Sequence, residues 1–243
     1  MRVGLLQLTS SADPAANLIA TRNMMRDAAG QGADFILTPE VTNCVSTSLQ
    51  HQQSVLRSET DDLTLAGLRA EAAALGVWLS IGSLALKTND SNNRFANRSF
   101  IINNVGDIIA RYDKIHMFDV NISKTETYRE SVAYRPGKQA VTVQTPFGRL
   151  GLSICYDLRF AYLYRALAKA GADILLVPAA FSPITGAAHW QPLLQARAIE
   201  TGCYVLATAQ TGDHGKRETY GHSMVVSPWG EVLIDAGTTK SVS

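Results

Sequence analysis

Short apolar runs alternate along the chain with segments of helical periodicity. RVGLLQL (2–8) and DFILTPE (34–40) are typical of buried strands, and the segment between them is predicted to be a helix. In that helix Asp13 is expected to be the N-cap and Pro14 the first helical residue. The pattern therefore predicts a strand–helix–strand unit at the start of the chain.

The second half of the chain repeats this pattern. A strand, a helix and a further strand return over 150–179, where GADILLVP (171–178) matches GADFILTP (32–39) of the first half. Two hairpin-like stretches also match, SFIINNVGDIIA (99–110) and SMVVSPWGEVLI (223–234). One such match can arise by chance between α/β chains, but two matches in the same order favour an internal repeat.

Two similar halves, each with several strands and two helices, predict how the chain folds. The expected architecture is an α/β fold, a four-layer α-β-β-α sandwich with internal pseudo-two-fold symmetry. In this arrangement Gly106 and Gly230 occupy equivalent hairpin turns. No Pro- or Ser-rich linker separates the halves, so residues 1–243 are expected to form a single domain.

Composition and charge narrow the class of protein. The net charge is only +1, which does not favour nucleic acid or an anionic membrane as a partner. The first apolar run is too short for a secretory signal, and no segment approaches the length of a membrane span. The three cysteines lack CxxC spacing and the five histidines are scattered, so neither a disulfide framework nor a metal site is expected. Free thiols favour a cytoplasmic setting.

The segment GLSICYDLRF is the first candidate for chemistry. An apolar run ends on Cys155, and two charged residues, Asp157 and Arg159, follow almost at once. A thiol at a strand-to-helix junction lies near the positive end of the helix, which favours the thiolate. The alternative is a buried structural cysteine, an interpretation that suits Cys44 and Cys203 better.

Three charged residues become candidates for catalysis when they are considered together with Cys155. Glu40 follows a strand and a proline, Lys114 follows the first hairpin, and Glu130 lies in a long irregular stretch. Each alone is consistent with a solvated side chain. A cysteine nucleophile, however, needs a base and an oxyanion stabiliser, which a Glu and a Lys can supply.

Three ordered segments resemble the signature motifs of a known family. FILTPE (35–40), YDKIHMFD (112–119) and GLSICYDLRF (151–160) are similar to those of the nitrilase superfamily of carbon–nitrogen hydrolases. The resemblance extends over nearly the whole chain, and the family fold is also a pseudo-symmetric αββα sandwich. Further stretches resemble its Nit branch: YRESVAYRPG, TGAAHWQPLLQARAIETGCYV and TYGHSMVVSPWGEVL.

The resemblance implies a mechanism and a role for each motif residue. Glu40 is the expected general base that activates Cys155, and the thiolate attacks an amide carbonyl to form a thioester and release ammonia. Lys114 is expected to stabilise the oxyanion together with the backbone N–H of Tyr156, and Glu130 to orient Lys114. No cofactor is implied.

The resemblance also implies a substrate class. In the Nit branch the arginine four residues after the nucleophile, here Arg159, binds a substrate carboxylate, which suits a guanidinium. Phe181 and Thr185 are expected to hold the 2-oxo acid end of a small amide. Asp157 is expected simply to cap the helix that follows.

Within the branch two activities and one non-enzymatic alternative are open. YDLRF and YGHS are more similar to deaminated glutathione amidases than to ω-amidases, which usually carry YDMRF and WGHS. The third possibility is a non-catalytic scaffold on the same fold. Relatives usually continue beyond IDAGTTKSVS (234–243) into a further strand and a tail that packs on a dimer partner. A homodimer is expected, with a truncated or absent tail leaving one sheet edge open.

Overall fold

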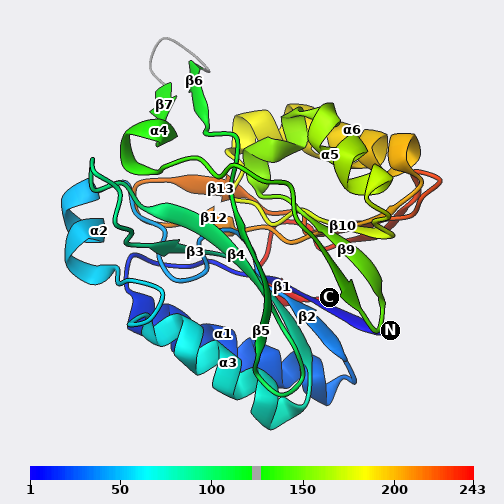
Figure 1. Ribbon diagram of the computed structural model, residues 1–243, viewed down its shortest axis with the longest axis horizontal. Helices are drawn as coiled ribbons and strands as arrows, with labels where there is room; N and C mark the ends of the chain where they lie inside the picture. The colour runs from blue at the N-terminus through cyan, green and yellow to red at the C-terminus, as the bar shows by residue number, and fades with distance from the viewer. Residues whose placement is uncertain (122–126) are drawn as a thin grey trace.

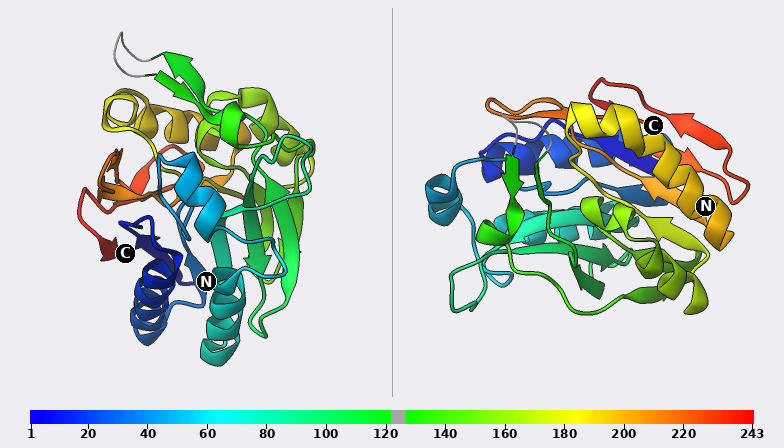
Figure 2. Two further views of the ribbon diagram at one scale, coloured as in Figure 1. Left: turned by 90° about the vertical axis from the view of Figure 1, so that its left-hand side faces the viewer. Right: turned by 90° about the horizontal axis from the view of Figure 1, so that it is seen from above.

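The computed structural model describes residues 1–121 and 127–243, in which two six-stranded sheets face each other (Figures 1 and 2). The first sheet has the strand order β16 (Ser241–Val242), β1 (Val3–Gln7), β2 (Phe35–Leu37), β3 (Trp78–Leu86), β4 (Ala96–Ile102), β5 (Ile108–Asp113). The second has the order β15 (Val232–Asp235), β14 (Met224–Val226), β11 (Tyr204–Ala207), β10 (Ile174–Leu176), β9 (Gly148–Leu152), β8 (Thr142–Thr145).

Helices cover the outer face of each sheet. α1 (Pro14–Gly30) and α3 (Leu63–Leu75) pack together on the first sheet, and α5 (Ala161–Lys169) and α6 (Pro183–Thr201) on the second (Figure 2). Asp13 accepts hydrogen bonds from Ala15 N and Ala16 N, so the predicted N-cap of α1 is confirmed. The four-layer α-β-β-α sandwich predicted from the repeats is confirmed as well.

The two sheets share one topology. β1, β2 and β3 are parallel neighbours, and β4 and β5 continue the sheet antiparallel; β9, β10, β11, β14 and β15 do the same in the second half. Gly106 and Gly230 have φ angles of 86° and 84° in the two equivalent hairpins. Positive φ is accessible to glycine at little cost, which explains why both turns carry it.

The apolar runs of the sequence correspond to the central strands. All three residues of β2 and all three of β10 are buried, because one face of each strand meets the opposite sheet and the other meets the helices. The core between the sheets joins Leu5 and Phe35 of the first half with Leu150 and Leu176 of the second. The contact between the sheets therefore holds the two halves together as one unit.

Short elements outside the sandwich gather at one end of it. They are α2 (Leu49–Val55), the strand pair β6 (Asp119–Asn121) and β7 (Thr127–Arg129), α4 (Glu130–Ala133), and the strand pair β12 (Thr211–Asp213) and β13 (Glu218–Tyr220) (Figure 1). The stretch around Glu130, which the sequence indicated as irregular, thus contains short regular elements.

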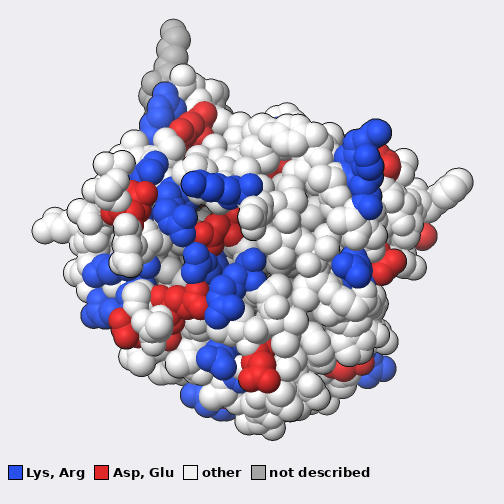
Figure 3. Space-filling model, viewed as in Figure 1, with Lys and Arg blue, Asp and Glu red and all other residues white. Residues whose placement is uncertain are grey.

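The surface and the sheet edge bear on two further expectations. β16 pairs antiparallel with β1, where Leu6 lies opposite Val242, so the two-residue strand β16, and not β1, forms this edge of the first sheet. Basic and acidic side chains are interspersed on the face shown in Figure 3. Among the described residues, no helix has the length and hydrophobicity needed to cross a bilayer.

Candidate active site

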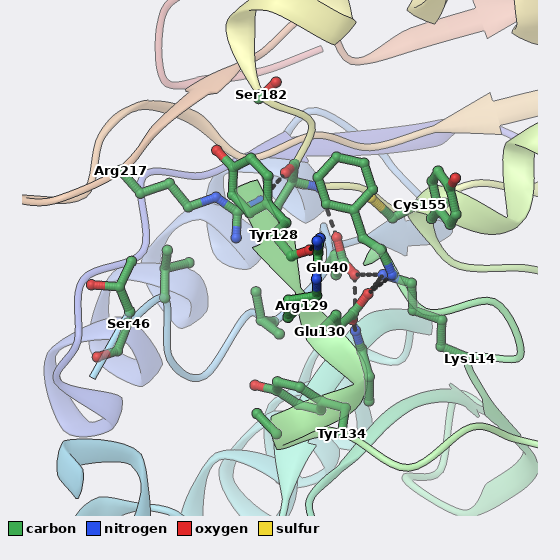
Figure 4. Close-up of a pocket in the computed structure, with 18 of the residues that line it drawn as sticks. Glu40, Ser46, Lys114, Tyr128, Arg129, Glu130, Tyr134, Cys155, Ser182 and Arg217 are labelled. Carbon is green, nitrogen blue, oxygen red and sulfur yellow. Dashed lines mark hydrogen bonds and ion pairs between the residues drawn. The ribbon is translucent and has the colours of Figure 1, made fainter. Parts of the chain in front are cut away.

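The predicted catalytic residues converge at the ends of strands from both sheets (Figure 4). Glu40 lies shortly after β2, Lys114 directly follows β5, and Cys155 lies shortly after β9, at the start of a 3-10 helix, η1 (Cys155–Arg159). Glu130 is the first residue of α4. Since β2 and β9 belong to different sheets, the site lies where the two halves of the repeat meet.

Lys114 is the centre of the cluster. Its Nζ donates to Glu40 Oε1 at 2.8 Å and to both carboxylate oxygens of Glu130 at 2.9 Å. Asn97 Nδ2 donates to the same Glu40 oxygen at 2.8 Å, and Lys114 is only 2% exposed. A buried cation held by two carboxylates is fixed in position and needs no rearrangement to meet developing negative charge.

The charges of this cluster are set by its own members. Burial alone would lower the pKa of Lys114, but Glu130 and Glu40 outweigh it and raise that pKa well above its usual value. Burial would likewise raise the pKa of Glu40, but the Lys114 charge prevails and lowers it. The resting site thus holds a lysinium ion and an ionised Glu40 carboxylate.

Cys155, the predicted nucleophile, lies in an unusual backbone conformation. Its φ angle of 52° lies in the left-handed region, and its N–H donates to Pro178 O at 2.8 Å. Positive φ at a non-glycine residue stores backbone strain, which is typical of functional positions. The strained turn holds Cys155 at the pocket, where its thiol hydrogen bond helps to lower the pKa of Glu40.

The resting state of the thiol differs from the sequence-based expectation. Burial, followed by the Glu40 charge, raises the pKa of Cys155 above its ordinary value, whereas a helix end was expected to favour the thiolate. η1 has only five residues, so little dipole accumulates along it. The resting Cys155 is therefore a protonated thiol, and a role as nucleophile would require that its proton be transferred during attack.

Asp157 has a different role from the expected cap of the next helix. α5 has Phe160 at its N-cap, without a side-chain hydrogen bond. The buried Asp157 carboxylate accepts instead from Ile154 N at 2.9 Å, Tyr112 Oη at 2.6 Å and His116 N at 3.0 Å, and it lies 2.6 Å from His116 Nδ1. It therefore ties the Cys155 turn to the segment that carries Lys114.

Replacing Asp157 with asparagine is expected to lower the free energy of unfolding by about 2–3 kcal/mol, because hydrogen bonds to a buried charge are lost or weakened. The same change should lower kcat by roughly 10-fold or more, since small displacements of catalytic groups are costly. Urea unfolding and steady-state kinetics measure the two effects. Asp27→Asn, at an exposed position of α1, is the matched control. An Asp157 variant as stable and active as that control would show that the tie is dispensable.

The catalytic cluster opens into a pocket of about 360 Å³. The predicted residues Phe181, Thr185 and Tyr156 line this pocket, as do all four catalytic candidates. Arg159 is not among the described lining residues. Its Nη2 lies 3.1 Å from His189 Nδ1, and its guanidinium carbon lies 5.9 Å from the centre of the Phe181 ring. Arg159 thus lies next to Phe181, at the end of the short helix that begins with Cys155.

Several lining residues were not found from the sequence. They include Asn97, Ser46, Tyr134 and Arg217. Only Asn97 had a usable signal, since a polar residue inside an apolar strand such as ANRSFII must find partners. The others lie in polar loops or short elements without periodicity. Across residues 1–121 and 127–243, no group of three or more His, Cys, Asp or Glu side chains is arranged to hold a metal.

The sequence is similar to known proteins over nearly its whole length. The model of the carbon-nitrogen hydrolase family matches residues 2–243. The deaminated glutathione amidase of Yersinia enterocolitica is 41% identical over 240 residues, 95% of this chain and 81% of that protein. The deaminated glutathione amidase of Dictyostelium discoideum is 43% identical over 242 residues, 96% of this chain and 82% of that protein.

A solved structure agrees with the sequence matches. The nitrilase and fragile histidine triad fusion protein NitFhit of Caenorhabditis elegans superposes with a TM-score of 0.90 at 37% identity. The alignment covers 99% of this chain and 58% of the fusion protein. Sequence and fold agree over the full described length, and this chain belongs to the carbon-nitrogen hydrolase family.

Proposed function

We propose that this carbon–nitrogen hydrolase is an amidase that acts on deaminated glutathione. It cleaves the amide bond that joins the 2-oxoglutaryl group to cysteine. The observation that carries the proposal is the placement of Lys114 between Glu40 and Glu130, beside Cys155, in one pocket. The names of the relatives from Yersinia and Dictyostelium support this choice of substrate.

The first half of the reaction forms a thioester. Cys155 Sγ attacks the amide carbonyl carbon, and the thiol proton passes to Glu40. Lys114 and the N–H of Tyr156 stabilise the oxyanion, and Glu130 holds Lys114 in position. The C–N bond then breaks, and Glu40 returns the proton to the leaving nitrogen.

The second half releases the acid. Water attacks the thioester carbon while Glu40 accepts a proton, the C–S bond breaks, and the Cys155 sulfur regains that proton. The leaving nitrogen of deaminated glutathione belongs to its cysteine residue, so the products are cysteinylglycine and 2-oxoglutarate. The expected release of ammonia applies to a primary amide such as 2-oxoglutaramate, the substrate of the alternative ω-amidase function.

The acyl group is the same for both substrates, and we propose the same residues for it. Phe181 and Thr185 line the same pocket as Cys155, and Arg159 lies next to Phe181. We propose that the Arg159 guanidinium, next to Phe181, binds the carboxylate of the 2-oxo acid. This role predicts that Arg159→Met lowers kcat/KM for both substrates to a similar extent.

The substrate is tested by measuring kcat/KM for deaminated glutathione and for 2-oxoglutaramate. Quantifying 2-oxoglutarate by mass spectrometry reports both reactions, because it is the common product. We expect deaminated glutathione to be preferred at least about 10-fold, since a larger part of the ligand is bound. The opposite preference would identify an ω-amidase, and no turnover of either would contradict the proposal.

Two further proposals concern the state of the protein in the cell. We propose a homodimer, because large apolar side chains are exposed on and near α5 and α6, including Tyr162 at 64% and Ile199 at 61%. A monomeric mass by sedimentation at micromolar concentration would contradict it. The three free, buried cysteines support a cytoplasmic location, which fractionation of the source cells would test.

A further inference from the structure

Arg217 is a cation of the pocket that the proposed mechanism does not use. It lies between β12 and β13, in a turn fixed by His214, whose ring nitrogens lie 2.6 Å from Ser10 O and 2.7 Å from Thr219 Oγ1. Its side chain extends from this hairpin into the pocket, on the side away from Cys155 (Figure 4). The hairpin therefore presents a positive charge to any bound substrate.

The guanidinium is only partly satisfied by the protein. It donates to Ala180 O, and its carbon lies 5.9 Å from the centre of the Tyr128 ring. Its Nε is buried without a hydrogen-bond acceptor, and no described carboxylate lies within 4.0 Å of it. Glu40 and Glu130 already pair with Lys114. A half-buried cation without a counter-ion is suited to receive an anion from a ligand.

Its position relative to Glu40 indicates which end of the substrate it faces. Ala180 N donates to Glu40 Oε2 at 2.9 Å, and the carbonyl of the same residue accepts from Arg217. Ala180 thus links Arg217 to Glu40, the residue proposed to protonate the leaving nitrogen. Arg159, in contrast, lies next to Phe181 and belongs to the same short helix as Cys155. The two arginines therefore reach the site from different elements, Arg217 next to the Glu40 side and Arg159 from the short helix that carries Cys155.

We propose that Arg217 binds the carboxylate of the leaving group, so that the enzyme selects amides whose amine half is an acidic peptide rather than ammonia. The inference rests on the proposed function. Deaminated glutathione carries one carboxylate on the 2-oxo acid and another on its glycine, and the second matches Arg217. Tyr128 contributes its ring beside the guanidinium, as a wall for the peptide. Arg217 is thereby a specificity-determining residue.

The test compares Arg217→Met with wild type on two substrates that share an acyl group. Only deaminated glutathione carries the glycine carboxylate, so the ratio of its kcat/KM to that of 2-oxoglutaramate should fall roughly 10- to 100-fold. Arg217→Lys, which keeps the charge, should restore part of the ratio. Lys216→Met removes an exposed charge from the same turn and should leave the ratio within about 2-fold.

A substrate change provides a test that does not depend on the variant folding. The substrate is deaminated glutathione with its glycine carboxylate converted to an amide. The kcat/KM of wild type on this amide should be lower than on deaminated glutathione by a factor similar to the one that Arg217→Met causes. Adding Arg217→Met should lower kcat/KM on the amide little further. If Arg217→Met loses the same factor in kcat/KM on deaminated glutathione and on 2-oxoglutaramate, their ratio is unchanged. That result would overturn the inference while the proposed function stands. Wild type inactive on deaminated glutathione would overturn both proposals, a distinct result.

Discussion

Replacing Cys155 with alanine is expected to lower kcat/KM for deaminated glutathione by at least about 10⁴-fold, because no other group can form the acyl intermediate. The thiol lies in the pocket beside Glu40, whose carboxylate is ionised and positioned to take its proton. The fold should persist, since alanine removes only one buried sulfur atom. Quantifying 2-oxoglutarate measures the loss, and circular dichroism checks the fold.

Intact mass spectrometry gives the same prediction a direct readout. Wild type quenched during turnover should carry the mass of a 2-oxoglutaryl thioester, and Cys155→Ala should carry none. Cys203→Ala is the matched control, because that buried thiol lies immediately before β11 and donates to Ala172 O at 3.0 Å, outside the pocket. Activity of the Cys155 variant close to that of the control would remove the thiol from the mechanism, whereas no turnover by wild type would favour the non-catalytic scaffold.

Replacing Lys114 with methionine is expected to damage both activity and stability. Loss of one oxyanion donor costs about 10²–10³ in kcat, and the disturbed position of Glu40 should add to it. The variant also leaves Glu40 and Glu130 without their shared cation in a buried site. Removing one partner of a buried ion pair costs about 3–5 kcal/mol, which should appear in urea unfolding at pH 8.

The pH dependence of this variant should be opposite in sign to that of wild type. In wild type Lys114 lowers the pKa of Glu40, so the contribution of Glu40 to stability is present above its unfolded pKa and is lost as the pH falls through its folded pKa. Without Lys114, burial is the largest remaining effect on Glu40 and raises its pKa, against the weaker effects of the Cys155 hydrogen bond and the Arg217 charge. In the variant, the contribution of Glu40 to stability is then lost as the pH rises. The difference in free energy of unfolding between wild type and variant should therefore be smaller at acid pH.

Kinetics provide an independent check of that sign. The acid limb of kcat/KM, where Glu40 becomes protonated, should move to higher pH in Lys114→Met. Lys169→Met, at an exposed position of α5, should leave both the limb and the stability unchanged within error. An acid limb that stays in place would show that Glu40 is not the titrating base.

The parts of this protein that could be predicted from its sequence are those with a local or repeated signal. The strand–helix alternation, the Asp13 cap and the paired hairpins depend on residues close together in the chain, so they are visible in the pattern. The three ordered motifs predicted Glu40, Lys114 and Cys155 as one site, and their convergence follows from the pseudo-symmetric sandwich.

The remaining features were decided by the tertiary structure. Asp157 was interpreted as a local cap, but its carboxylate also reaches Tyr112 and His116, more than 40 positions away. The thiol pKa depends on burial and on Glu40, neither of which the CYDLR segment encodes. Arg217 lies in a polar turn and carries no periodic signal.

Sequence patterns report what a residue does to its near neighbours. They do not report which strand ends and loops meet across the sandwich. The motifs that place Glu40, Lys114 and Cys155 in one pocket could therefore be identified from the sequence alone. The charge state of the nucleophile, the tie through Asp157 and the cation on the leaving-group side depend on contacts between distant segments, which exist only once the two halves have packed together.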